Sequence, residues 1–140
     1  AEDAKKESEA KIPEIQSSVT KHTGTFNGVT VKYTVTAADT HLKNDKGEAE
    51  ASIFTIAYTK DGVKDSAKRP VTFMFNGGPG SASLWVHMGV FGPKRVDVPS
   101  DAVNAGAAPY NVIDNPLSLL DVTDLVFIDP VGTGFSRVIG

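Results

Sequence analysis

A short apolar run that ends in a glycine-rich turn constrains the fold of this chain most. Residues 71–75, VTFMF, are apolar on both faces, which is typical of a strand buried in the middle of a sheet. Residues 76–80, NGGPG, follow directly, and the segment from Ser81 to Met88 then contains no helix breaker. The sequence therefore predicts a strand, a tight turn and a helix in this order.

Three other segments complete the predicted sheet. Residues 29–37 and 51–60 alternate between apolar and polar side chains, and a hairpin turn signal, Asn27-Gly28, precedes the first of them. Residues 122–129, VTDLVFID, form a second buried run. A helix-containing connection joins the two buried runs, so they should be parallel. The predicted class is α/β, with an antiparallel hairpin leading into a mixed, mostly parallel sheet.

Composition excludes several classes of protein. The chain has 140 residues, of which 40% are hydrophobic, and this suits one domain with a real core. A net charge of -3 without a dense Lys/Arg cluster argues against nucleic-acid partners and anionic membrane surfaces. No stretch approaches the roughly 18 consecutive apolar residues of a membrane span. The chain has no cysteine, which excludes disulfides and thiolate chemistry.

The N-terminal residues differ in character from the rest. Residues 1–21 are rich in charged and small side chains, and we expect a polar tail there, followed by a domain over residues 22–140. The chain starts at Ala1 rather than at methionine. Signal-peptide cleavage would leave such a start, so we expect export to the periplasm or medium, although artificial trimming would leave the same start.

The glycines of residues 76–80 let main-chain N–H groups turn outward toward a bound anion. A phosphate is one candidate, but the segment matches neither GxxxxGK[ST] nor GxGxxG, and Pro79 lacks an N–H group. The oxyanion of an acyl-transfer intermediate is another. α/β-Hydrolases take one oxyanion donor from the loop after the third strand, and residues 71–75 would be the third strand here. A turn needed only for tight helix packing is the third possibility.

Three segments, NGGPGSAS, GVFGPKRV and DLVFIDPVGTGFSR, occur in this order and together resemble the serine carboxypeptidase family of α/β-hydrolases. The resemblance extends from about Phe26 to the end of the chain. It implies hydrolysis of the C-terminal peptide bond of a peptide substrate with a free C-terminus. The reaction would use a Ser, His and Asp triad and an acyl-enzyme, without a metal or an organic cofactor.

The resemblance also assigns roles to the glycine-rich turn. Gly78 would donate its main-chain N–H to the oxyanion hole. Asn76 and the N–H of Gly77 would hold the terminal carboxylate of the substrate. Pro79 and Gly80 would shape the turn without touching the substrate.

The triad itself has no match in this chain. No serine lies in the pattern GxSxG, and the glutamate that the family carries beside its nucleophile has no matching segment. Because the triad of this fold follows the strands present here, we expect the N-terminal part of an enzyme, inactive without its C-terminal half. The alternative is a non-catalytic domain that binds peptides or anions. A reading frame that continues into GxSxG favours the enzyme, and a natural stop at Gly140 favours the binding domain.

Two positions depart from the family pattern. Met74 replaces a tryptophan, and Val90 replaces a glutamate, both of which help shape the carboxylate site in many members. These replacements leave strict C-terminal specificity open and permit another acyl-transfer activity. The missing cysteines fit a bacterial branch of the family better than the disulfide-bearing eukaryotic members.

Several polar residues are expected to be structural. Ser83 and His87 lie four residues apart on the predicted helix, and such a spacing is more often a surface pair than a catalytic dyad. Asp129 precedes Pro130 and is expected to cap the following loop. His22 and His41 are expected in exposed turns. Finally, the resemblance to α/β-hydrolases implies that residues 122–129 pair beside residues 71–75. The missing fifth strand would then leave a bare apolar edge, so we expect poor solubility for the isolated chain.

Overall fold

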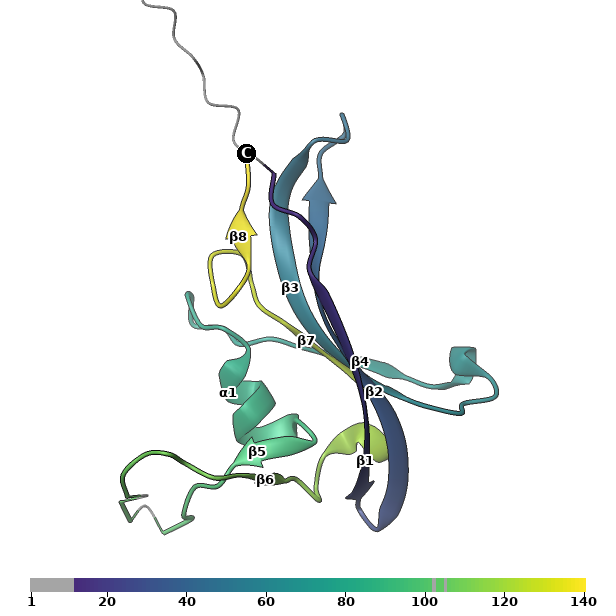
Figure 1. The fold of residues 1–140 in the computed structure, drawn as a ribbon, viewed down its shortest axis with the longest axis vertical. Coiled ribbons are helices and arrows are strands. Elements are labelled where there is room, and N and C mark those ends of the chain that lie inside the picture. The colour runs from purple at the N-terminus through teal and green to yellow at the C-terminus, as the bar shows by residue number, and fades with distance from the viewer. Residues whose placement is uncertain (1–11, 102, 105) are drawn as a thin grey trace, which may run out of the picture.

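The computed structural model describes residues 12–101, 103–104 and 106–140. Its main sheet has the strand order β1-β2-β3-β7-β4, and β8 also pairs with β3 (Figure 1). The strands are β1 (Ser17–Phe26), β2 (Val29–Lys43), β3 (Ala49–Lys60), β4 (Val71–Met74), β7 (Asp124–Ile128) and β8 (Arg137–Val138). A separate ribbon joins β5 (Lys94–Val96) to β6 (Val112–Asp114). The helical segments are η1 (Ser66–Lys68), α1 (Leu84–Val86), η2 (His87–Phe91) and η3 (Leu119–Asp121).

The predicted hairpin turn is confirmed, but its first strand is longer than expected. Asn27 and Gly28 both have positive φ angles, 49° and 80°, and connect β1 to β2 as a two-residue turn. β1 begins at Ser17, so the expected tail is wrong for residues 17–21, and residues 1–11 lie outside the described part. Main-chain pairing with β2 over the whole of β1 holds this strand, whereas Phe26 is its only buried side chain. Because almost all side chains of β1 are exposed, its sequence shows little alternation of apolar and polar residues from which the start of the strand could be predicted.

The mixed sheet confirms the predicted fold class. β1, β2, β3 and β7 pair antiparallel, and β7 pairs parallel with β4 in the register Val71↔Asp124 to Met74↔Phe127. β7 thus lies between β3 and β4, as predicted for residues 122–129. β4 itself lies at the edge of the sheet and not in its middle. Phe73 is 62% exposed, which corrects the expected burial of residues 71–75 and agrees with the expected bare apolar edge.

The core lies on one face of the sheet. Its buried members are Phe26, Val31, Tyr33, Met74, Leu120, Leu125 and Phe127. Val86 of α1 packs against them, and Figure 1 shows α1 and the β5–β6 ribbon on the same side of the sheet. This packing fixes the helix that follows the glycine-rich turn against the core.

The helical segment after the turn begins and ends later than expected. It starts at Leu84 instead of Ser81 and continues from α1 into the wider turn of η2, which ends at Phe91. The N-cap residue, Ser83, makes no side-chain hydrogen bond to the helix. Its hydroxyl group instead bonds to Asp129, at 3.0 Å. A distant partner therefore sets the start of this helix, and local sequence could not reveal it.

His22 and His41 lie in strands β1 and β2, so their expected placement in turns is wrong. The ring of His22 is exposed and stacks on Tyr33, with centroids 5.6 Å apart. His41 is partly buried, and within the described residues its Nε2 atom has no hydrogen-bond partner. Neither ring approaches the glycine-rich turn through a hydrogen bond or a stacking contact in the described part of the chain.

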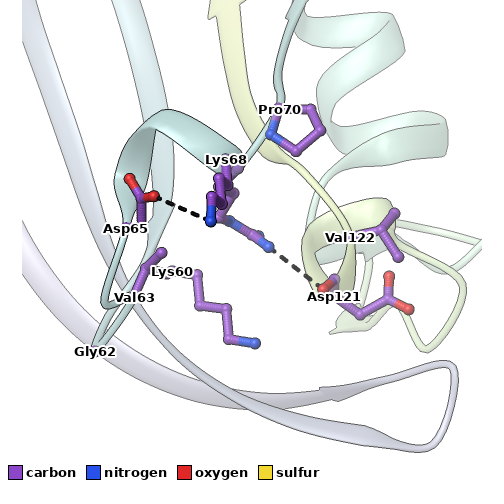
Figure 2. A pocket seen from close by; sticks show the side chains of 9 residues that line it. Lys60, Gly62, Val63, Asp65, Lys68, Pro70, Asp121 and Val122 are labelled. Carbon is purple, nitrogen blue, oxygen red and sulfur yellow. Dashed lines mark hydrogen bonds and ion pairs between the residues drawn. The ribbon is translucent and has the colours of Figure 1, made fainter.

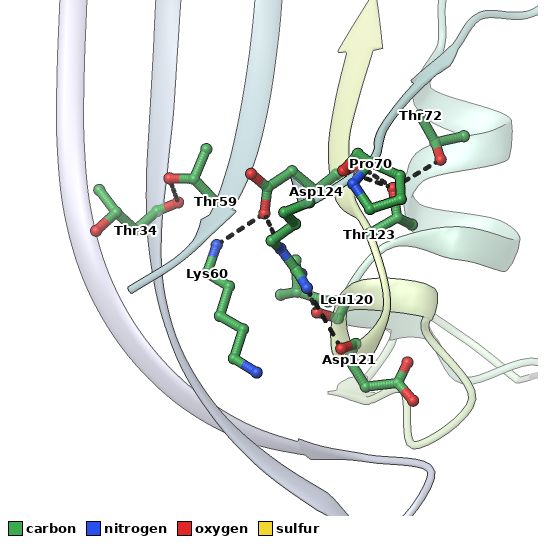
Figure 3. Close-up of polar contacts among 10 residues, drawn as sticks. Thr34, Thr59, Lys60, Pro70, Thr72, Leu120, Asp121, Thr123 and Asp124 are labelled. Atoms are coloured by element: carbon green, nitrogen blue, oxygen red, sulfur yellow. Dashed lines mark hydrogen bonds and ion pairs between the residues drawn. The ribbon is translucent and has the colours of Figure 1, made fainter. Parts of the chain in front are cut away.

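A partly buried ion pair closes the end of the sheet at which β4 and β7 begin. Asp124 Oδ1 accepts hydrogen bonds from Arg69 Nε at 2.7 Å and from the Lys60 main chain at 2.9 Å (Figure 3). Arg69 also donates to the carbonyl oxygens of Leu120 and Asp121. The Arg69 and Asp124 side chains are only 10% and 18% exposed. This cluster joins β3, β7 and η3.

Candidate active site

The glycine-rich turn, residues 76–80, lies at the carboxyl end of β4 and is open to solvent. Gly77 and Gly78 are exposed, and a Cβ atom built on either would meet no heavy atom within 4 Å. Gly78 and Gly80 have φ angles of 88° and 93°, which side-chain-bearing residues rarely adopt. Backbone conformation therefore requires glycine at these two positions, and the surrounding space is available to a ligand.

Asn76 ties this turn to the following helix. Its Oδ1 atom accepts a hydrogen bond from the main-chain N–H of Val86 at 3.1 Å, and the residue is partly buried. Within the described residues, the Nδ2 group of Asn76 donates to no protein acceptor. The side chain is thus oriented by its oxygen and keeps two N–H donors for a ligand.

The two positions that depart from the family pattern lie in different environments. The Met74 side chain is buried in the core cluster. Val90 lies in η2 and is 56% exposed, and its carbonyl oxygen accepts a hydrogen bond from Asn115 Nδ2 at 2.8 Å. Met74 therefore contributes packing below the turn, whereas Val90 leaves an apolar surface on the helix.

Asp129 caps the loop that follows β7, as predicted, and also holds the glycine-rich segment. Its Oδ2 atom accepts from the Phe135 N–H at 3.2 Å. Its Oδ1 atom accepts from the N–H and the hydroxyl group of Ser83 at 2.9 and 3.0 Å. The contact with Ser83 was missed in the sequence. One signal was available: a carboxylate follows one parallel strand, a glycine-rich turn follows the other, and these strand ends meet at one edge.

His87 is buried beneath the same segment, which corrects the expectation of a surface pair with Ser83. Its ring stacks on Phe127 with centroids 4.3 Å apart, and Nε2 lies 2.5 Å from the Tyr58 hydroxyl oxygen. Burial lowers the pKa of His87 to about 4, against the smaller opposing effect of Asp129. Burial also raises the pKa of Tyr58. Both groups are therefore neutral at pH 7, and the tautomer of His87 decides which of them donates.

Ser83 and His87 have different partners and do not form a catalytic dyad. Ser83 bonds to Asp129, and His87 bonds to Tyr58. A cavity of about 180 Å³ borders both residues, and its walls are mainly apolar, including Phe54, Ile56 and Phe135. A small apolar cavity beside buried polar groups fits a structural arrangement better than a solvated catalytic cleft.

A larger cavity, of about 400 Å³, lies at the opposite end of the parallel strands. Charged side chains, among them Lys60, Lys68 and Asp121, line it beside Pro70 (Figure 2). Pro70 immediately precedes β4, whereas the glycine-rich turn follows β4. The larger cavity is therefore separate from the candidate site. Lys68 pairs across it with Asp65 at 3.7 Å, and both side chains are more than half exposed.

Neither a metal centre nor a membrane span is found in the part of the chain that the structure describes. Residues 12–101, 103–104 and 106–140 contain no group of three or more His, Asp or Glu side chains placed to hold a metal ion. Over the same ranges, no helix has the length and apolar character needed to cross a bilayer.

The mixed sheet and the glycine-rich turn define the chain as the N-terminal part of an α/β-hydrolase fold. The family model described as serine carboxypeptidase matches residues 28–138, and the chain belongs to this family. It is also similar to the crystal structure of Kex1(delta)p, a prohormone-processing carboxypeptidase from Saccharomyces cerevisiae, with 27% identity and a TM-score of 0.53. This similarity covers 74% of the present chain but only 21% of the yeast chain. No curated protein matches the sequence.

Proposed function

We propose that this chain is the N-terminal portion of a serine-type carboxypeptidase and supplies part of its active site. In this proposal Gly78 donates its N–H to the oxyanion hole, while Asn76 and the N–H of Gly77 bind the terminal carboxylate of the peptide. The geometry of the glycine-rich turn carries the proposal. The turn is exposed at the carboxyl end of β4, and Gly78 has a φ angle of 88°, which glycine adopts readily and other residues rarely do.

The oxyanion donor acts on the acyl-transfer steps. When a serine attacks the scissile carbonyl, negative charge develops on the carbonyl oxygen, and a preorganised N–H group stabilises it. Loss of one such donor typically costs about 2.7 to 4 kcal/mol of transition-state stabilisation. Pro79 and Gly80 hold the turn in the conformation that presents the Gly78 N–H. The nucleophile and its base would come from the C-terminal half, so we expect no hydrolysis by the 140 residues alone.

Recognition of the C-terminus of the peptide substrate would depend on uncharged hydrogen-bond donors. The Oδ1 atom of Asn76 already accepts from Val86, so its Nδ2 group can donate to a carboxylate oxygen. The N–H of Gly77 can donate to the same carboxylate. A peptide with a C-terminal amide lacks the negative charge, so it should bind more weakly to these donors.

The test uses the complete polypeptide of the reading frame and measures release of the amino acid from an N-blocked dipeptide and of the amino-acid amide from the corresponding C-terminal amide. Asn76→Asp keeps an acceptor for the Val86 N–H but places a negative charge where the donors were. We expect KM for the free acid to rise at least about tenfold, with a smaller change for the amide. Asn76→Ala removes the donors without adding charge and also removes the acceptor of the Val86 N–H, so it separates the effect of charge from the loss of both contacts.

Two results would contradict the proposal. One is an unchanged preference for the free acid in Asn76→Asp. The other is efficient release by the 140 residues alone, because these contain no GxSxG serine. If the complete polypeptide ends at Gly140 and only binds peptides, the non-catalytic alternative holds. Export of the protein, expected from its N-terminal residues, stays a prediction.

A further inference from the structure

Two hydrogen-bonded contacts hold the glycine-rich turn and the residues that lead from it into α1. At the start of the turn, Asn76 accepts from Val86 in the following helix. Three residues beyond the turn, Ser83 donates twice to Asp129, 46 positions along the chain. The first contact joins the turn to its own helix, and the second joins it to the strand beside β4. The second contact therefore fixes the turn relative to the sheet.

Several hydrogen bonds hold Asp129 in this position. The residue is 6% exposed, and its two oxygens accept three hydrogen bonds, two from Ser83 and one from the Phe135 N–H. A buried carboxylate is tolerated only with such compensation. The main-chain oxygen of Asp129 also accepts from the Ser136 hydroxyl at 2.7 Å. Asp129 thus cannot shift without breaking contacts in two segments.

Gly134 lies in close contact with the same carboxylate. A Cβ atom built on Gly134 would lie 2.1 Å from Asp129 Oδ2, which is far inside van der Waals contact. The loop after β7 therefore closes directly over Asp129. Gly132, in the same loop, also has a positive φ angle, but a Cβ atom there would meet nothing within 4 Å.

We propose that Asp129 is a positioning residue, which holds the glycine-rich turn in the place where the Gly78 N–H can stabilise the oxyanion. This inference rests on the proposed function of Gly78. Asp129 does not touch the substrate and acts through Ser83. Because Asn76 has its own anchor on Val86, a change at Asp129 should lower kcat while the KM for a free-carboxylate peptide stays nearly constant.

Asp129→Asn tests this role with the smallest change in shape. An amide has one accepting oxygen and one donating nitrogen. If the oxygen faces Ser83, the nitrogen faces the Phe135 N–H, and two donors then oppose each other. The reverse orientation places a donor against the Ser83 N–H, while the Ser83 hydroxyl group can turn to accept. Asparagine therefore loses the main-chain contact with one of the two segments that Asp129 joins.

Two glycine variants supply the matched pair. Gly134→Ala drives a methyl group into the Asp129 carboxylate, whereas Gly132→Ala introduces a side chain at positive φ without that collision. The φ angles are 51° at Gly134 and 81° at Gly132, so the backbone strain is no greater at Gly134. An effect confined to Gly134→Ala therefore arises from the contact with Asp129. Ser83→Ala removes one of the three donors and serves if Asp129→Asn does not fold.

The experiment measures kcat and KM of the complete polypeptide with the N-blocked dipeptide, together with hydrogen exchange of the His87 and Val86 amides. The His87 N–H donates to the Ser83 carbonyl oxygen at 2.9 Å, so its exchange reports displacement of Ser83. The Val86 N–H donates to Asn76 and is the internal reference. We expect Asp129→Asn and Gly134→Ala to lower kcat by about 10- to 100-fold, with KM within about twofold. The His87 amide should exchange about tenfold faster in the same variants, and Gly132→Ala should remain near the unmodified protein on both measures.

The inference is overturned if folded Asp129→Asn keeps its kcat and its His87 exchange rate, or if Gly132→Ala and Gly134→Ala behave alike. Failure of the proposed function has a different signature, because the unmodified polypeptide would then release no amino acid. In that case the His87 exchange rate still decides whether Asp129 holds the turn.

Discussion

Protonation of His87 should destabilise the protein at mildly acidic pH. In the folded state, burial lowers the pKa of His87 to about 4, whereas an unfolded chain has the ordinary value of 6.5. The unfolded state therefore binds more protons between these two values, and stability falls as pH decreases from about 6.5 to 4. A tenfold difference in proton affinity is worth about 1.36 kcal/mol, so the full loss is on the order of 3 kcal/mol.

The contacts of His87 explain this direction. The ring is 7% exposed and stacks on Phe127, and its Nε2 atom lies 2.5 Å from the Tyr58 hydroxyl oxygen. Burial raises the pKa of Tyr58, which therefore remains protonated and uncharged. A protonated Nε2 can donate only if the Tyr58 hydroxyl group turns to accept, and the hydroxyl group brings no negative charge to stabilise the buried imidazolium. The negative charge of Asp129 offsets only part of this cost.

Urea unfolding of the protein between pH 4 and 8 tests the prediction. His87→Gln keeps an amide oxygen that can accept from Tyr58 but does not titrate, so its free energy of unfolding should change less with pH. Other carboxylates titrate in both proteins, and the difference between the two profiles isolates His87. His22→Gln, at an exposed position in β1, controls for the substitution itself. Parallel pH profiles for the unmodified protein and His87→Gln would refute the reasoning.

Three further predictions concern other parts of the chain. Arg69→Met leaves the partly buried Asp124 carboxylate without its cation, so the free energy of unfolding should fall by about 1 to 3 kcal/mol, and chemical denaturation should show it. Asp124→Asn on the Arg69→Met background should recover part of this loss, and no recovery would contradict an electrostatic origin. Gly78→Ala forces a side chain onto a φ angle of 88° and should lower kcat for peptide hydrolysis more than Gly80→Ala, which is similarly strained at 93°. Equal losses would argue against a special role for the Gly78 N–H. Phe73 lies on the edge strand and is 62% exposed, so Phe73→Lys places a charge on this edge. The substitution should increase the soluble fraction of the isolated chain, as measured by centrifugation and light scattering. Unchanged aggregation would show that this edge is not responsible.

The turns and the strand neighbours were the parts of the fold that could be predicted best. Asn27-Gly28 forms the expected hairpin turn, and positive φ angles occur at Gly78 and Gly80 in the expected turn. These features depend on backbone sterics at single residues, which the residue types reveal directly. The parallel direction of β7 and β4 followed from the connection rule for parallel strands, and their pairing followed from the resemblance to α/β-hydrolases. The edge position of β4 was expected. Burial of both of its faces was expected as well, but at an edge one face stays open, so Phe73 is exposed and Met74 is buried.

The polar contacts beneath the turn could not be predicted in the same way. Ser83 and Asp129 are 46 positions apart, and Tyr58 and His87 are 29 apart. Such pairs meet only after the sheet has formed, and helical spacing suggested the wrong partner for each member of the Ser83–His87 pair. β1 was missed for a related reason, because its hydrogen bonds to β2 are made by the main chain and leave little trace in side-chain periodicity.

The position of Asp129 nevertheless follows from topology once β4 and β7 are parallel neighbours. Their carboxyl ends meet at one edge, so the residue after β7 and the turn after β4 must lie close together. A small turn rich in glycine has few side chains with which to hold its own shape. A carboxylate on the neighbouring strand can hold it by accepting from main-chain and hydroxyl donors, and Asp129 does this through Ser83. The glycines permit the conformation of the turn, and a residue outside the turn selects its position.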